Sequence, residues 1–263
     1  MLEGKKILVT GVATNDSIAY ATAIAARSLG ADVFVSAFPR DVDSVRELMG
    51  DDFHVVGADL TKEDDLDTLH RTIDSRWGSL DGALHAVAFA PRDALAGDFL
   101  ATPSASVEIA MRTSAWSYAA LARVLQELAP PSGGSLVGLD FDAGDRAWPI
   151  YNWMGVCKAA LRSVSKYVAR DLGAAGIRSN LVAAGPLSTR AALGIPNFSL
   201  LTEAWDTTSP LAWSSTDASP VADVVCFLLS DFARAITGEL LHVDGGYHAM
   251  ARTRSEQGGS AGL

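Results

Sequence analysis

A tyrosine and a lysine stand seven positions apart in PIYNWMGVCKAAL (149–161), at the start of a long helix-like segment. Seven helical residues turn through about 700°, some 20° short of two turns, so we expect Tyr151 and Lys158 to share one helix face. A phenol supplies one directional hydrogen-bond donor, and a nearby ammonium favours negative charge on an oxygen close to it. The pair could therefore stabilise an oxyanion while the lysine reaches an adjacent diol. Alternatively, Tyr151 packs near the helix start and Lys158 is a solvated surface cation.

A second group of candidate residues follows the first strand-like run. In LVTGVATNDSIAYATAIA (8–25), Gly11 ends the run and Ser17 precedes an apolar-periodic segment. Such a turn feeds a helix whose free N–H groups and positive dipole end could hold a pyrophosphate, although the G-x-G-x-x-G spacing is missing. An ordinary turn glycine and a plain N-cap serine are the alternatives.

The ends of the next two strand-like runs offer residues for the adenosine half of a dinucleotide. SAFPR (36–40) brings no carboxylate for the ribose hydroxyls, but Phe38 could flank an adenine and Arg40 could meet a 2′-phosphate. Asp59, which ends FHVVGAD, could accept a hydrogen bond from the adenine amino group. It could equally cap the next helix, either itself or through Thr61.

These residues lie at the ends of strand-like runs that alternate with helix-like segments. Several runs are continuous in Val, Leu and Ile, as expected for strands covered on both faces. The alternation predicts an α/β fold, a Rossmann-type doubly wound parallel sheet of about seven strands flanked by helices on both faces. The expected strands span 6–10, 32–38, 53–59, 82–89, 134–140, 178–184 and 239–244, and the clearest helix-like segments span 17–30, 62–78, 104–129 and 152–175.

Length, charge and cysteine content narrow the class of protein. The 263 residues, 49% of them hydrophobic, can form one core, which predicts a single domain at 1–250 and a disordered polar tail at 251–263. A net charge of −10 makes nucleic acid and anionic membranes poor partners. No apolar run approaches a membrane span and no signal-peptide core precedes the first strand, so we expect a cytoplasmic protein. Cys157 and Cys226 lie in apolar stretches, which favours buried thiols over a disulfide or a metal site.

Motifs spread over residues 3–248 resemble one family. They are the bacterial NADH-dependent enoyl-acyl-carrier-protein reductases, a divergent branch of the short-chain dehydrogenases/reductases in which Tyr-x6-Lys replaces Tyr-x3-Lys. Phe141 stands where many relatives carry a second tyrosine, and LVGLDFDAGDRAWPIYNWM around it is most similar to the mycobacterial and other actinobacterial enzymes. The other segments that carry the resemblance are GVATNDSIAY, LHAVAFAPRDALAGDF, YNWMGVCKAAL, IRSNLVAAGPLSTRAA and GELLHVDGGY.

The resemblance implies an activity and a set of site residues. It implies hydride transfer from NADH, with NADPH less expected, to the β-carbon of a trans-2-enoyl thioester on acyl carrier protein or coenzyme A. Tyr151 would donate to the thioester oxygen, Lys158 would hold the nicotinamide ribose, and Phe141 and Met154 would line the acyl slot. It further implies a homotetramer that works in fatty-acid or related acyl-chain biosynthesis without a metal. The cofactor contacts carried over by position are Gly11, Ser17, Ile18, Phe38, Asp59, Leu60, Ala88, Lys158, Leu187 and Thr189.

The chain also departs from the family's pattern. Ala86 and Ala88 replace the usual serine and glycine after the fourth strand, and we expect weaker NADH binding because a hydroxyl is lost and a Cβ narrows the backbone's approach. The segment 189–210 is shorter than the mycobacterial substrate loop, which predicts short or medium acyl chains. Two alternatives stay open. A ketone or alcohol oxidoreductase would carry a serine where Asp140 and Phe141 stand, and a non-catalytic nucleotide-binding protein could share the fold.

Overall fold

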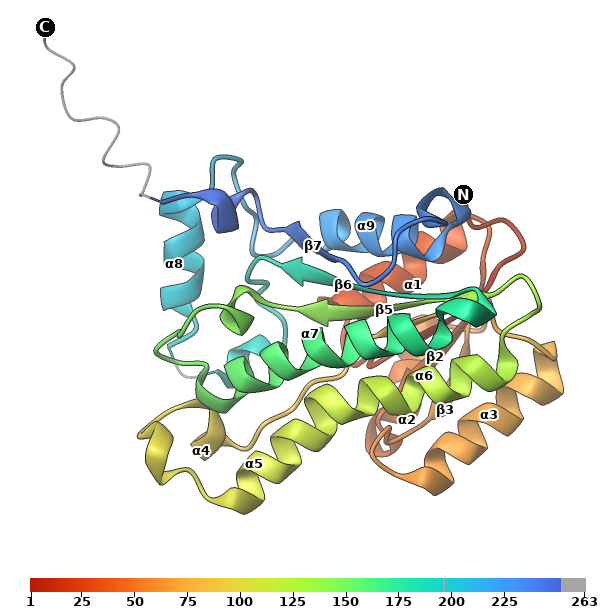
Figure 1. Ribbon diagram of the computed structural model, residues 1–263, viewed down its shortest axis with the longest axis horizontal. Coiled ribbons are helices and arrows are strands. Elements are labelled where there is room, and N and C mark those ends of the chain that lie inside the picture. The colour runs from red at the N-terminus through yellow and green to blue at the C-terminus, as the bar shows by residue number, and fades with distance from the viewer. Residues whose placement is uncertain (196, 252–263) are drawn as a thin grey trace, which may run out of the picture.

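A seven-stranded parallel sheet organises the computed structural model, which describes residues 1–195 and 197–251 (Figure 1). The strand order β3-β2-β1-β4-β5-β6-β7 confirms the predicted doubly wound α/β fold. The predicted disordered tail lies, from residue 252 onward, outside the described residues. The strands are β1 (Lys6–Thr10), β2 (Asp32–Ala37), β3 (His54–Gly57), β4 (Gly82–His85), β5 (Gly134–Asp140), β6 (Ile177–Ala184) and β7 (Leu240–Val243).

Helices cover both faces of the sheet (Figure 1). Helices α1, α2 and α9 pack on one face, and α3, α6 and α7 pack on the other. The central strands are therefore buried on both sides, which explains their continuous apolar sequences. The helices are α1 (Ile18–Ser28), α2 (Val42–Met49), α3 (Glu63–Trp77), α4 (Arg92–Leu95), α5 (Ser104–Met111), α6 (Ser117–Leu128), α7 (Asn152–Leu172), α8 (Ser199–Thr208) and α9 (Ser219–Leu229).

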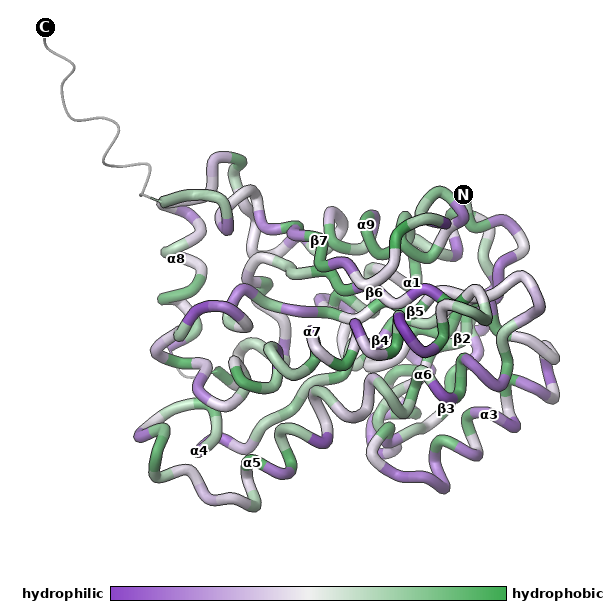
Figure 2. The backbone as a smooth tube through the Cα atoms, viewed as in Figure 1, coloured by the Kyte–Doolittle hydropathy of each residue, from purple (hydrophilic) through white to green (hydrophobic). Residues whose placement is uncertain are grey.

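Outer helices such as α3 alternate hydrophobic and hydrophilic residues along the chain, as Figure 2 shows. In α3 the buried side chains are Leu66, Leu69 and Ile73, three or four residues apart, and the first turn is acidic. This spacing gives the helix one apolar stripe that faces the sheet, and the acidic turn suits the positive end of its dipole. Among the helices of residues 1–195 and 197–251, none is long and apolar enough to cross a membrane.

The predicted helix at 104–129 is divided in the structure. A π-helical turn, Arg112–Trp116, separates α5 from α6. Ser114 within this turn donates from Oγ to the carbonyl of Phe89 and accepts from the amide of Phe89, both at 3.0 Å. The wider turn thus lets the side chain of Ser114 bind the loop after β4. Because this loop begins after His85, β4 is shorter than the strand predicted at 82–89.

The carboxyl ends of all seven strands lie at one edge of the sheet because every pairing is parallel. Figure 1 shows α8 and the N-terminal end of α7 gathered beyond the ends of β5 and β6. The strand order reverses between β1 and β4, so the connections leave in opposite directions there. In open α/β sheets this is the place where ligands bind.

Candidate active site

The turn after β1 brings the backbone of Gly11 against the loop after β4. Gly11 has φ +79°, and a Cβ built on it would lie 2.3 Å from the carbonyl oxygen of Ala86. The amides of Gly11 and Val12 donate to the carbonyl of Ser36 in β2, at 3.0 and 3.2 Å. The ends of β1, β2 and β4 therefore meet around a position that only glycine fits, at the point where the strand order reverses.

Ser17 begins α1 as an N-cap. Its Oγ accepts from the amide of Tyr20 at 3.1 Å and donates to the carbonyl of Thr14 at 2.7 Å. The alternative that Ser17 is a plain N-cap is therefore confirmed, and this cap fixes the N-terminal end of α1. Ile18, the first residue of α1, packs against the core beneath the sheet.

The loops after β2 and β4 expose several of the predicted cofactor residues. Phe38 is 44% exposed, and the guanidinium of Arg40 lies 4.9 Å from the centre of its ring. Ala88 is exposed on the loop after β4. These side chains are therefore accessible at the same edge of the sheet as Gly11.

Asp59 lies in the turn between β3 and α3. Its Oδ1 accepts from the amide and the hydroxyl of Thr61, at 3.0 and 2.7 Å. The capping alternative for Asp59 or Thr61 is wrong, because the N-cap of α3 is Lys62 and the Asp59 carboxylate closes a turn before the helix. The side chain of Leu60 is buried in the core, so this residue presents only its backbone at the edge.

Tyr151 and Lys158 lie together at the beginning of α7. Tyr151 occupies the N-cap position, and its carbonyl accepts the first helical hydrogen bond from Gly155 at 3.1 Å. Lys158 is 6% exposed, and its Nζ donates to the carbonyl of Leu139 in β5 at 2.8 Å. Lys158 is therefore not a solvated surface cation, because β5 fixes its ammonium at the carboxyl end of the sheet.

The charge of Asp140 influences the pKa of both residues. Burial, followed by Asp140 and Cys157, raises the pKa of Tyr151. Burial lowers the pKa of Lys158, and Asp140 opposes that shift. The pKa of the Tyr151 phenol is thus set mainly by burial and by an acidic neighbour, and not by the ammonium that the sequence suggested. Tyr151 consequently stays protonated at neutral pH and is a hydrogen-bond donor.

Sequence reasoning missed Arg162, which holds the end of β5 against α7. Its Nε donates to Asp140 Oδ2 at 2.5 Å, its Nη2 donates to the carbonyl of Phe141 at 3.1 Å, and its Nη1 pairs with Asp145. Burial raises the pKa of Asp140, and the charges of Lys158 and Arg162 oppose that shift. Arg162 follows Lys158 by four residues, so the helix-face argument applied to Tyr151 and Lys158 extends to it.

Phe141 and Met154, predicted to line an acyl slot, lie in two different apolar clusters that both contact Tyr151. The Phe141 ring centre is 5.0 Å from that of Tyr151. Met154 belongs to the second cluster, where its buried neighbours include Ala90 and Cys157. The cluster around Phe141 holds side chains that the sequence did not single out, namely Ala143, Trp148, Ile150, Ile195, Phe198, Leu201, Ala204, Trp205, Trp213 and Tyr247.

The segment after β6 carries the last two predicted cofactor residues. Leu187 is buried, and its carbonyl accepts from the amide of Thr189 at 2.8 Å. Trp213 Nε1 donates to the carbonyl of Pro186 at 2.9 Å, and the amide of Gly185 donates to Val243 in β7 at 2.9 Å. The backbone of this segment is thereby fixed beside the ends of β6 and β7.

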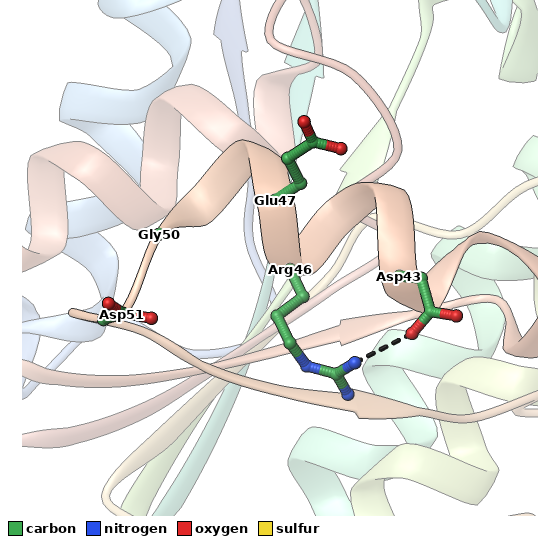
Figure 3. Close-up of a pocket in the computed structure, with 5 residues that line it drawn as sticks. All are labelled: Asp43, Arg46, Glu47, Gly50 and Asp51. Atoms are coloured by element: carbon green, nitrogen blue, oxygen red, sulfur yellow. Dashed lines mark hydrogen bonds and ion pairs between the residues drawn. The ribbon is translucent and has the colours of Figure 1, made fainter.

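The hollow drawn in Figure 3 shares no residue with this site. It lies along α2, where Arg46 pairs with Asp43 at 2.8 Å and where Glu47, Gly50 and Asp51 complete the lining. Its lining is mostly acidic side chains of an exposed helix. Among the described residues, no group of three His, Cys, Asp or Glu side chains is arranged to hold a metal ion.

Known proteins resemble the chain over nearly its full length. A family model described as Enoyl-(Acyl carrier protein) reductase matches residues 11–248. The enoyl-[acyl-carrier-protein] reductase [NADH] of Mycolicibacterium smegmatis is 40% identical over 262 residues, covering 94% of this chain and 97% of the relative. The enzymes of the same name from Aquifex aeolicus and Bacillus cereus are 40% and 38% identical, covering 95% of this chain and 93% and 99% of the relatives. The matched region contains both the turn at Gly11 and the N-terminal end of α7.

Proposed function

The chain belongs to the enoyl-(acyl carrier protein) reductase family, and we propose that Tyr151 and Lys158 carry that family's reaction in it. The chain is an NADH-dependent enoyl-[acyl-carrier-protein] reductase of fatty-acid synthesis. The observation that supports the two residues best is the buried ammonium of Lys158, which donates to the carbonyl of Leu139 at the end of β5, on the helix that Tyr151 begins. The ketone reductase alternative would place a serine at Asp140, whose carboxylate is instead bound by Arg162.

The phenol of Tyr151 donates a hydrogen bond to the thioester oxygen, where negative charge develops as the β-carbon is reduced. This interaction is stronger in the transition state than in the bound substrate, so it lowers the barrier. NADH, when bound, supplies the hydride to the β-carbon, and a proton then reaches the α-carbon. Lys158 would hold the hydroxyls of the ribose that carries the nicotinamide and so orient the ring, and it need not supply a proton.

The residues at the strand ends fit a dinucleotide. Gly11 lets the turn after β1 pack directly against the carbonyl of Ala86, where a Cβ would overlap, and the N-terminal end of α1, capped by Ser17, favours a pyrophosphate. Leu187 would hold the nicotinamide carboxamide through its backbone, with Phe141 and Met154 beside the acyl chain. The remaining proposed cofactor contacts are Ile18, Phe38, Asp59, Leu60, Ala88 and Thr189.

Assembly, location and domain extent are part of the same proposal. We propose a cytoplasmic homotetramer in which residues 1–250 form one reductase domain. Ile109, Trp116 and Val156 on α5, the π-helical turn and α7 are 38% to 46% exposed, and such apolar surface suits a contact between copies. The free thiols of Cys157 and Cys226 suit a reducing compartment.

Substitution of the two catalytic residues tests the proposal. The measurement is NADH oxidation with crotonyl thioesters of acyl carrier protein and coenzyme A, together with an NADH dissociation constant from fluorescence titration. We expect Tyr151→Phe to lower kcat by about 10²–10³-fold with little change in NADH affinity. We expect Lys158→Ala to weaken NADH binding by about tenfold or more, since a charge-assisted hydrogen bond is lost. Lys166→Ala, on the exposed side of α7, is the matched control.

Two results would contradict the proposal. Wild-type protein that binds NADH and reduces no enoyl thioester would exclude the reaction itself. If Tyr151→Phe turned over as fast as wild type, the family's activity would stand but Tyr151 would have no catalytic role.

A further inference from the structure

We propose that four aromatic rings packed together near Tyr151 restrict the enzyme to short-chain enoyl thioesters, an inference that rests on the proposed function. The four rings, called the ring stack below, are Phe141, Trp148, Trp205 and Tyr247. They come from the end of β5, the loop before α7, helix α8 and the turn after β7. Segments that are far apart in the sequence thus meet in one cluster that contacts Tyr151.

The ring stack forms a continuous series outward from the catalytic phenol. The Phe141 ring centre lies 5.0 Å from that of Tyr151, and Trp205 lies 5.5 Å beyond Phe141 at an interplanar angle of 26°. Tyr247 stacks on Trp205 at 3.7 Å and 12°. Trp148 closes the side of the series, 5.5 Å from Trp205 and 6.1 Å from Tyr247.

The spacing of these rings leaves no passage for an alkyl chain. Carbon atoms in contact lie about 3.5–4.0 Å apart, so a chain that threads between two rings needs them roughly 7–8 Å apart. The distances within the ring stack run from 3.7 to 6.2 Å. Trp205 is fully buried and Phe141 is 7% exposed, so a long acyl chain has to displace packed rings to enter.

Trp205 contributes to the ring stack through the volume of its indole ring and not through the N–H group of that ring. Within the part of the chain that the structure describes, its buried Nε1 has no hydrogen-bond partner. This nitrogen would lie 2.9 Å from a Cβ at Gly185, which places the ring against the segment proposed to hold the nicotinamide. The indole of Trp213, in the loop between α8 and α9, does donate, to the carbonyl of Pro186. Burial of the unpaired N–H of Trp205 destabilises the fold, so we attribute the presence of tryptophan here to the volume of its ring.

The other apolar cluster that contacts Tyr151 supplies a matched control. There Trp153 stacks on Phe99 at 4.9 Å, and Trp153 packs with the cluster of Met154. A truncation at Trp153 also opens space near the phenol, but outside the ring stack. It therefore separates a loss of the ring stack from a general loosening of the site.

The experiment compares wild type with Tyr247→Ala, Trp148→Met and Trp153→Ala. One arm measures kcat/KM for crotonyl, octenoyl, dodecenoyl and hexadecenoyl thioesters. The other measures binding of butyryl- and palmitoyl-coenzyme A to the enzyme with NAD⁺ by calorimetry, which needs no turnover. Thermal unfolding confirms that each variant is folded, and the two ring-stack variants are independent of each other.

We expect wild-type kcat/KM to fall by about tenfold or more between octenoyl and hexadecenoyl substrates, since even one misplaced methylene costs about tenfold. We expect Tyr247→Ala and Trp148→Met to recover about tenfold on the long substrates and to tighten palmitoyl binding by a similar factor. Trp153→Ala should leave unchanged the ratio of kcat/KM for long substrates to kcat/KM for short substrates. A wild-type rate that rises with chain length, or an equal gain in Trp153→Ala, overturns the inference. Failure to reduce even the crotonyl thioester overturns the proposed function instead, and the binding arm then still tests the ring stack.

Discussion

Gly11 is a backbone position in the proposed cofactor turn that no side chain would fit. Its φ of +79° and the 2.3 Å separation between a built Cβ and the Ala86 carbonyl are two distinct penalties for any side chain. Gly78, at the end of α3, has φ +66° and open space around a built Cβ, so it carries only the first penalty. The two glycines therefore form a matched pair.

We expect Gly78→Ala to cost about 1 kcal/mol of unfolding free energy and Gly11→Ala to cost a further 1–3 kcal/mol or so, because overlap with a carbonyl adds to backbone strain. Gly11→Ala should also weaken NADH binding by about tenfold or more, whereas Gly78→Ala should leave it unchanged. Urea denaturation and fluorescence titration measure both quantities. If the two variants lost equal amounts of stability and of NADH affinity, the close approach of the backbone at Gly11 would contribute to neither quantity.

Helix α7 is the element that assembles the catalytic end. Tyr151, Lys158 and Arg162 stand at its N-cap, in its second turn and in its third turn, and the last two bind the end of β5. Arg162 also joins the loop that leads into the helix, through the carbonyl of Phe141 and the carboxylate of Asp145. One arginine therefore ties strand, loop and helix together near the N-terminal end of α7.

Removal of this arginine should leave a buried carboxylate without its partner. We expect Arg162→Met to lower the free energy of unfolding by about 3–5 kcal/mol, the usual effect of breaking a buried ion pair from one side. Asp140→Asn added to Arg162→Met should recover part of that loss, because the uncompensated charge is gone. Arg170→Met, an exposed residue of the same helix, should change stability by less than about 0.5 kcal/mol. Urea denaturation of wild type, the single variants Arg162→Met and Asp140→Asn and the double variant measures the coupling between the two residues. Losses of stability that add independently would argue against that coupling.

The strands could be predicted from sequence more fully than the surroundings of the site. A parallel strand covered on both faces is a continuous apolar run, so β1 and β5 were located residue for residue. The serine at position 114 that widens a helix turn leaves the helical period intact, so the break between α5 and α6 was not foreseen. Ranges such as 82–89 extended too far, because the loop after β4 stays apolar beyond the point where pairing ends.

At the site, residues on one helix face were predictable and contacts between distant segments were not. The spacing of Tyr151 and Lys158 is local, and helical geometry alone places both at the end of α7. Trp205 and Tyr247 stack although 42 residues separate them, and nothing in the local pattern of either segment encodes their contact. Sequence reasoning therefore places residues on one helix face more readily than it predicts the packing between distant segments.

The dependence of global stability on pH follows from a histidine at the centre of the sheet. His85 at the end of β4 is buried, with Nε2 2.8 Å from Ser117 Oγ and its ring edge-on to Tyr118. Burial, followed by the charge of Lys158, lowers the pKa of His85 from 6.5 to about 3. The folded protein thus keeps this imidazole neutral at pH values where the unfolded chain protonates it.

The sign of the effect follows from proton linkage. Below about pH 6.5 the unfolded state binds one more proton than the folded state, so stability falls as pH decreases toward 3, by up to about 1.4 kcal/mol per pH unit. The raised pKa of Asp140 acts in the opposite direction, because there the folded state holds the proton more tightly, and it offsets part of the loss near its own titration range. Urea denaturation across roughly pH 5–7 should therefore show a falling free energy for wild type and a shallower fall for His85→Gln, which keeps a hydrogen bond to Ser117 and cannot titrate. Parallel curves for the two proteins would mean that His85 protonates without unfolding the molecule, and that the sheet can open locally around β4.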